Sequence, residues 1–158
     1  MILSALILIL STAFFFFHLQ ATCQRILRRQ FDRAYFLAIV NANRLEFPAV
    51  RRALEQFNAP VDYPRLRMML NCDFLALSYL LKHAVNLNQR YSREERLLIF
   101  YFRLVLISLI ARHWLRLREK PAVLDLAVIL QYFANILGER MNSVRFGNLS
   151  AFDYLLSF

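Results

Sequence analysis

The stretch that decides the fold is the opening one, Met1 to Arg29, which reads MILSALILILSTAFFFFHLQATCQRILRR. Its first 24 residues contain no lysine, arginine or carboxylate side chain, and three arginines then follow within five residues. Such a run is compatible with a cleaved export signal, a membrane-spanning helix, or the first buried helix of a soluble protein. The order of charge and the length of the apolar segment distinguish these three readings.

The opening run differs from a secretory signal, which carries its positive charge before the apolar segment rather than after it. It also differs from a buried helix of a soluble protein, which has a polar face that repeats every 3.6 residues. From residue 1 to residue 19 the only polar side chains are Ser4, Ser11, Thr12 and His18. As a helix, the run of about 17–19 residues is roughly 27 Å long, close to a hydrocarbon core of about 30 Å. We therefore predict a transmembrane anchor over residues 1–20.

Charge sets the expected orientation of this anchor. Arginines follow the apolar run and no charged side chain precedes it. Because cytoplasmic flanks carry the excess of Arg and Lys, we expect the N-terminus outside and the rest of the chain in the cytoplasm. The expected location is the inner membrane of a bacterium, with an organellar inner membrane as the alternative. The arginines expected at lipid headgroups are Arg25, Arg28, Arg29 and Arg33.

Two later apolar stretches raise the question of further spans. Residues 97–110 carry Arg103 near their centre, and residues 121–137 contain Asp125 and Gln131. A central arginine costs roughly 2.5–3.5 kcal/mol on insertion scales. If both stretches spanned, the basic connection between them would lie outside, against the charge rule. We predict core helices and a single-pass protein, with three spans as the alternative.

Composition predicts an all-α fold. Of 158 residues, 59% are hydrophobic, and only two are glycine and four proline, which leaves few tight turns. We expect one N-terminal transmembrane helix that continues into a small cytoplasmic bundle of about five helices. The expected division is an anchor (1–20), a juxtamembrane helical stalk (21–46) and a cytoplasmic helical domain (47–158).

Local patterns place the individual helices. Neither Gly nor Pro occurs before Pro48, which predicts one long helix from the membrane into the domain. Further helices are predicted over residues 48–57, 64–85, 93–118 and 121–141. Ser92 followed by Glu95 predicts a capping box, and the helix after it is expected to be the central one. Residues 142–150 are predicted to form a loop before a last helical turn.

No spacing of residues predicts catalysis or metal binding. The three histidines are scattered, and Cys-x-x-Cys and His-Glu-x-x-His pairs do not occur. Two separated glycines cannot build a nucleophile elbow or a phosphate-binding loop. We predict no enzyme, no cofactor and no metal, and an unrecognised catalytic site is the least favoured alternative. Because buried charges need partners, we expect Arg103 and Asp125 to form a buried ion pair.

Charge and the end of the chain suggest the partners. The net charge is +9, which suits anionic lipid, an acidic protein or nucleic acid. Membrane lipids are the expected partner, and nucleic acid is not. The apolar C-terminal stretch is expected to dock, on the bundle or on a partner, through Phe152, Tyr154 and Phe158.

These features together predict a non-catalytic accessory or scaffold subunit of a larger membrane protein complex. The alternative is a membrane-tethered adaptor that recruits an acidic soluble partner or nucleic acid through its arginine-rich surfaces. Both readings depend on protein–protein or electrostatic contacts rather than on a reaction.

Overall fold

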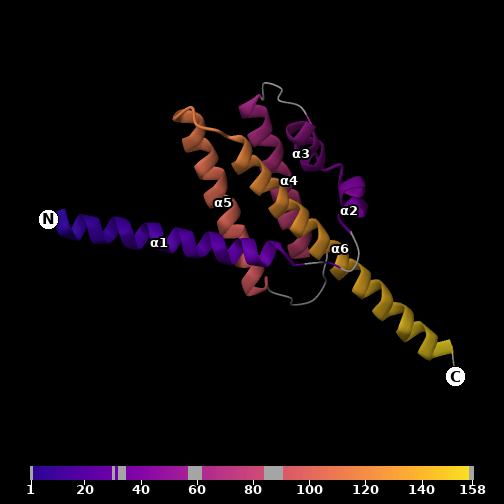
Figure 1. Ribbon diagram of the computed structural model, residues 1–158. Helices are drawn as coiled ribbons and strands as arrows, with labels where there is room; N and C mark the ends of the chain where they lie inside the picture. The colour runs from indigo at the N-terminus through magenta and orange to yellow at the C-terminus, as the bar shows by residue number, and fades with distance from the viewer. Residues whose placement is uncertain (1, 30, 32–34, 57–61, 84–90, 157–158) are drawn as a thin grey trace.

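The protein is all-helical in the part of the chain that its computed structural model describes. Backbone is described for residues 2–29, 31, 35–56, 62–83 and 91–156, and the side chains of residues 2 and 143–156 lie outside the description. The helices are α1 (Ile2–Leu27), α2 (Phe36–Asn43), α3 (Phe47–Gln56), α4 (Tyr63–His83), α5 (Arg93–Trp114) and α6 (Lys120–Leu156) (Figure 1). The described residues contain six helices and no strand, which confirms the all-α part of the predicted fold.

The central helix is α6, which contacts each of the other five helices. The sequence-based expectation that α5 takes this place is wrong. Ala122, Ala127, Ala134 and Gly138 are small and buried. Neighbouring helices can therefore approach α6 closely on more than one side, because interaxial distance depends on the side chains at the contact.

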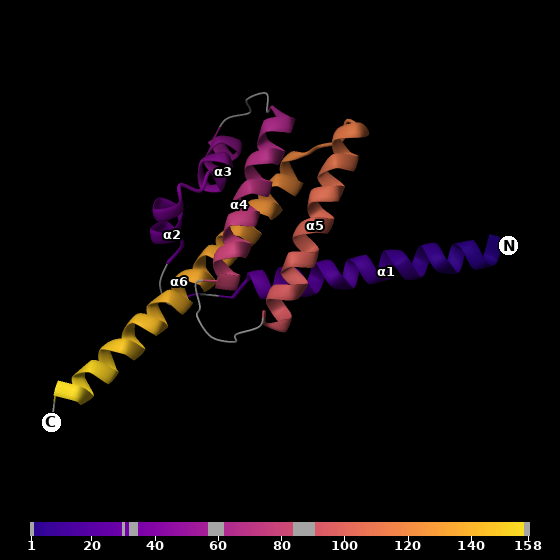
Figure 2. The same cartoon turned by 180° about the vertical axis from the view of Figure 1, so that it is seen from behind.

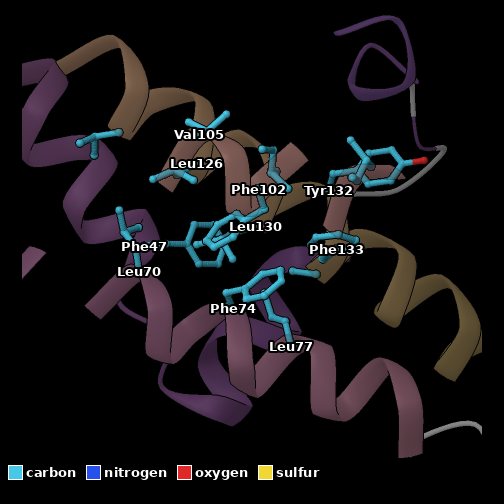
Figure 3. Packing of buried hydrophobic residues seen from close by; sticks show 14 of the residues in the cluster. Phe47, Leu70, Phe74, Leu77, Phe102, Val105, Leu126, Leu130, Tyr132 and Phe133 are labelled. Carbon is cyan, nitrogen blue, oxygen red and sulfur yellow. The ribbon is translucent and has the colours of Figure 1, made fainter. Parts of the chain in front are cut away.

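Aromatic rings from α4, α5 and α6 fill the middle of the core (Figure 3). The rings of Phe74 and Phe102 stack with their centroids 4.0 Å apart, and the ring of Phe133 lies 6.3 Å from that of Phe74. All three side chains are at most 5% exposed. Such pairs contribute about 0.5–1.5 kcal/mol beyond the burial of their area, so these rings hold the three long helices together.

Two short helices are capped from neighbouring helices rather than by their own flanking residues. Asn135 of α6 accepts a hydrogen bond from the Phe36 amide at 2.9 Å, where α2 begins. One carboxylate oxygen of Asp73 in α4 accepts from the amides of Glu46 and Phe47, at 2.9 and 2.7 Å, where α3 begins. Because the first amides of a helix have no partner within it, these acceptors determine where α2 and α3 start.

We expect Asp73→Ala to lower the free energy of unfolding by about 1–3 kcal/mol, because two shielded amides lose their acceptor. Thermal or denaturant unfolding in mild detergent measures this loss. Asn71→Ala is the matched control, since Asn71 is exposed on the same helix, and its effect should stay within about 0.5 kcal/mol. Equal stability of the two variants would contradict the capping role.

The ionisation of Asp73 adds a pH dependence. Burial raises the pKa of this carboxyl above its ordinary value of 3.8, and the two amide hydrogen bonds lower the pKa only in part. A raised pKa means that the folded state favours the protonated carboxyl. This contribution to stability is present below the ordinary pKa and is lost as the pH rises through the native pKa.

Gly138 lies against Tyr35, just before α2. A Cβ at position 138 would come 2.3 Å from the Cβ of Tyr35, which no non-bonded pair of carbons allows. We expect Gly138→Ala to displace α2 and to cost about 1–3 kcal/mol, against a gain of at most about 1 kcal/mol in helix propensity. Thermal unfolding of this variant and of Gly138→Ala/Tyr35→Gly tests the clash. The clash is refuted if the single variant is as stable as the wild type.

Three expected boundaries are wrong. The helix predicted over residues 93–118 ends at Trp114. The predicted continuous helix is broken, because α1 ends at Leu27 and α2 begins at Phe36. Phe31, between them, contacts the ring of Tyr132 edge-on with centroids 5.5 Å apart, so packing on α6 favours the turned chain over a straight helix. The predicted loop over residues 142–150 is instead part of α6.

The predicted capping box at the start of α5 is confirmed. The hydroxyl of Ser92 accepts from the Glu95 amide at 3.1 Å, and the carboxylate of Glu95 accepts from the Ser92 amide at 3.1 Å. The predicted helices over residues 48–57 and 64–85 also agree with α3 and α4 to within about two residues, the usual uncertainty of helix ends.

Candidate membrane interface

The N-terminal part of α1 is an exposed apolar helix. All sixteen residues from Leu3 to His18 are exposed, and this part projects away from the bundle in both views (Figures 1 and 2). The hydroxyl of Thr12 donates to the carbonyl of Leu8 at 2.7 Å, which satisfies that polar group within the helix. Contiguous apolar surface of this kind marks a membrane or protein contact.

The stretch of α1 that is exposed on all sides ends at His18, and beyond it one side of the helix is buried. Leu19 is 8% exposed and Cys23 is fully buried, where α1 packs on α5 and α6. A hollow of about 390 Å³ remains at this junction, and it is lined by Phe16 and Gln20 of α1 and by Tyr101, among others, of α5. The exposed part of α1 therefore meets the bundle close to His18.

Within the part of the chain that the structure describes, three helices are long and apolar enough to cross a membrane, namely Leu3–Leu27, Arg93–Trp114 and Lys120–Asn142. They differ in how much protein covers them. Of the most apolar stretch, 6% is buried in α1, 28% in α5 and 72% in α6. All three helices are long and apolar enough to span, so the single-pass topology stays a prediction. The share of each helix that protein covers nevertheless distinguishes α1, which is almost bare, from α6, which is mostly covered.

Three of the four arginines expected at headgroups fall in the described chain. Arg25, in the last turn of α1, and Arg28 and Arg29, just after it, are all exposed. Arg25 lies about 10 Å along the axis beyond His18. The guanidinium of Arg29 is 3.5 Å from the carboxylate of Glu139, with both side chains about half exposed. Arg33 lies outside the described residues.

The predicted buried ion pair between Arg103 and Asp125 is not formed. Arg103 is exposed on α5, because it lies on the side of the helix opposite to the core residues Leu98 and Val105. Asp125 is partly buried on α6 and lines the hollow beside α1, together with Arg112. No salt bridge joins Arg103 to Asp125 in the structure's described portion.

A different buried charge pair joins α5 to α6, and the sequence analysis missed it. Glu95 is 2% exposed, and its carboxylate accepts hydrogen bonds from the Arg140 guanidinium and from the Ser92 amide. The side chain of Arg140 is 19% exposed. The capping box alone accounts for a glutamate at position 95, so the sequence gives no reason to expect a second partner. The signal for that partner is the burial of Glu95, which only the structure shows.

The described side chains do not form a cluster that could hold a metal ion. No group of three or more His, Cys, Asp or Glu residues that could hold a metal ion occurs among them. The ring of His113 stacks on Tyr63 at 3.9 Å between centroids, and its Nδ1 lies 2.8 Å from the carboxylate of Glu119. Burial raises the pKa of the Tyr63 hydroxyl, so this hydroxyl is harder to deprotonate at neutral pH.

A second hollow, of about 340 Å³, holds two arginines that already have partners. It is lined by Arg29, Arg51 and Gln131, among others. Arg51 donates to the carboxylate of Glu55 at 2.9 Å and also to the side-chain oxygen of Gln131. The bond to Gln131 connects Arg51 of α3 to α6, and Arg29, which follows α1, pairs with Glu139 of α6.

The residues expected to dock a partner lie at the far end of α6. Phe152 and Tyr154 belong to its last turns, and their side chains, like all of Phe158, fall outside the description. The C-terminal end of α6, which includes positions 152 and 154, projects away from the bundle (Figure 1).

Comparison of the chain with protein-family models, with curated proteins and with solved structures finds no match in any of the three.

Proposed function

We propose that this protein is a non-catalytic accessory or scaffold subunit of a larger membrane protein complex, anchored by α1 as a single span. The observation that carries the proposal is the exposed apolar stretch Leu3–His18. It projects from a bundle whose core side chains are already buried against one another. Lipid is the environment that suits such a helix. On this proposal α1 holds the bundle at the membrane surface, where partner subunits meet it.

The arrangement of helices supports one span rather than three. α1 runs across α5 in both views instead of alongside it (Figures 1 and 2). If α1 follows the membrane normal, α5 then lies along the membrane surface. Spanning by α5 would also place Arg103 near the middle of the bilayer, which is costly. Spanning by α6 is not needed to satisfy its apolar residues, because most of them are covered by protein.

The basic end of α1 supports an orientation with the bundle in the cytoplasm, by the positive-inside rule. On this basis the proposed location is the inner membrane of a bacterium. The surfaces proposed to meet partners are the sides of α1 within the bilayer and the projecting end of α6, a helix of 37 residues that is about 55 Å long.

Cysteine accessibility tests the topology. Native Cys72 is exposed on α4, and Leu117, 56% exposed between α5 and α6, is replaced by Cys in a Cys72→Ser background. A membrane-impermeant maleimide is applied to right-side-out and inside-out vesicles. A single span predicts that both cysteines react in the same vesicles, the inside-out ones. Reaction at opposite sides would establish further spans and overturn the single-pass proposal.

Purification in mild detergent tests the role. A scaffold subunit should come with stoichiometric membrane proteins that resist high salt, identified by mass spectrometry. Salt-sensitive capture of a soluble acidic protein or of nucleic acid would favour the adaptor alternative instead, because exposed charge pairs are screened by salt. Catalytic activity of the isolated chain would refute both readings.

A further inference from the structure

One face of α5 combines exposed apolar and exposed basic side chains. Phe100, Ile107 and Trp114 are 50%, 61% and 86% exposed, and Arg96 and Arg103 are exposed with them. Successive members of this set are three, four or seven residues apart, so they share one side of the helix. We call these five residues the α5 stripe.

The opposite side of α5 packs on the bundle. Leu98, Phe102, Val105 and Leu109 are at most 8% exposed, and at 100° per residue they lie roughly half a turn from the α5 stripe. One side of α5 is therefore buried in the core, and the α5 stripe is the side that the bundle leaves uncovered.

The α5 stripe lies where α1 leaves the bundle. Phe16 and Gln20 of α1 line the same hollow as Tyr101 and Ser108 of α5, so the base of the exposed stretch of α1 is beside the middle of α5. α5 is also the helix on the side of the bundle from which α1 projects, and α1 runs across it (Figures 1 and 2). A bilayer crossed by α1 therefore has its surface along α5.

The composition of the α5 stripe matches an anionic lipid surface. Trp and Phe occur on the apolar face of helices that lie in the membrane interface, and arginine side chains extend from there to phosphate groups. The α5 stripe contains no carboxylate, so nothing in it repels lipid phosphate.

We propose that α5 is a second membrane contact, which lies flat in the interface of an anionic bilayer through the α5 stripe. The inference rests on the proposed anchoring by α1 and adds to it. Interfacial helices bury their apolar face about 5–10 Å into the boundary between headgroups and acyl chains. The two contacts together restrict the tilt of the bundle relative to the membrane surface.

Fluorescence quenching tests the depth of the α5 stripe, because Trp114 is the only tryptophan of the chain. The full chain is reconstituted in vesicles of phosphatidylglycerol and phosphatidylcholine that contain lipids brominated at a shallow or a deep acyl position. Phe100→Trp and Ile107→Trp are made in a Trp114→Phe background. We expect all three tryptophans to be quenched equally, and more by the shallow than by the deep bromolipid.

Two control positions separate this proposal from the anchoring by α1. Phe14→Trp, in the same background, reports on α1 and should be quenched most by the deep bromolipid. Leu37→Trp reports on α2, on the far side of the bundle from the projecting part of α1 (Figure 1), and should not be quenched. Leu37 is 47% exposed, so this control is accessible to solvent in the same way as the α5 stripe.

Each remaining outcome has one meaning. Deep quenching at positions 100 and 107 with shallow quenching at 114 would show that α5 crosses the bilayer. Quenching at position 14 but nowhere on α5 would leave the anchor intact and make the α5 stripe a solvent or protein surface. Loss of quenching at position 14 would overturn the anchor and the α5 contact together.

The role of charge has its own variant. Arg96→Glu/Arg103→Glu should abolish the quenching of Trp114, because carboxylates would face lipid phosphate. In the same vesicles the Phe14→Trp probe, combined with these two changes, should be quenched as before. Unchanged quenching of Trp114 would refute recognition of anionic lipid by the α5 stripe.

Discussion

Replacement of both Ile7 and Leu10 by arginine should release the protein from the membrane. The two side chains are 61% and 70% exposed on α1, so on the proposed anchoring both face lipid. An arginine near the centre of a span costs about 2.5–3.5 kcal/mol, which gives about 5–7 kcal/mol for the pair. Flotation in a density gradient after a carbonate wash measures the membrane-bound fraction and separates it from aggregates.

The matched control for this result is Gln24→Arg on the same helix. Gln24 is exposed beyond the buried Leu19, at a depth where arginines already occur, so this variant should float with the membrane like the wild type. Circular dichroism in detergent establishes that the arginine pair leaves the bundle helical. If the Ile7→Arg/Leu10→Arg protein still floats after the wash, α1 does not reside in lipid.

The second large effect is expected at Glu95. Glu95→Ala removes the acid of the buried pair with Arg140 and half of the capping box with Ser92. Removal of one partner of a buried pair costs about 3–5 kcal/mol, because the other charge stays shielded from water. Denaturant unfolding in mild detergent measures this loss, which is a large share of the stability of an ordinary domain.

Glu94→Ala is the natural comparison. Glu94 lies in the same first turn of α5 but is exposed, and its interaction with the helix dipole amounts to about 0.3–1 kcal/mol. The double variant Glu95→Ala/Arg140→Met should recover part of the loss, because the positive charge that paired with Glu95 is removed together with the carboxylate. Equal losses at positions 94 and 95 would contradict the importance of the buried pair.

Much of the helical layout follows from local pattern. The apolar opening run predicts the exposed part of α1, and Ser92 with Glu95 predicts the start of α5, because a capping box involves only four consecutive residues. Prolines 48 and 64 lie in the first turns of α3 and α4, where a missing amide hydrogen costs nothing. These signals act within one or two helical turns, so the sequence alone carries them.

Burial of individual charges could not be predicted in the same way. The sequence places Arg103 and Asp125 in apolar stretches, and from this we expected a buried pair. The two instead lie apart, Arg103 exposed and Asp125 partly buried, while Glu95, which looked like a simple cap, is the buried acid. Periodicity states that a helix has an apolar side, but the packing of neighbours decides how much of the remaining surface is covered.

What the sequence by itself determined is the all-α class, the apolar opening segment and the helix starts with local caps. What only the tertiary structure decided is that α6 is the central helix, that the chain turns between α1 and α2, and that α2 and α3 begin at caps from other helices. The caps on Phe36 and Phe47 come from residues 99 and 26 positions away. Acceptors so distant reach these amides only after the helices have packed, and a local pattern contains no record of them.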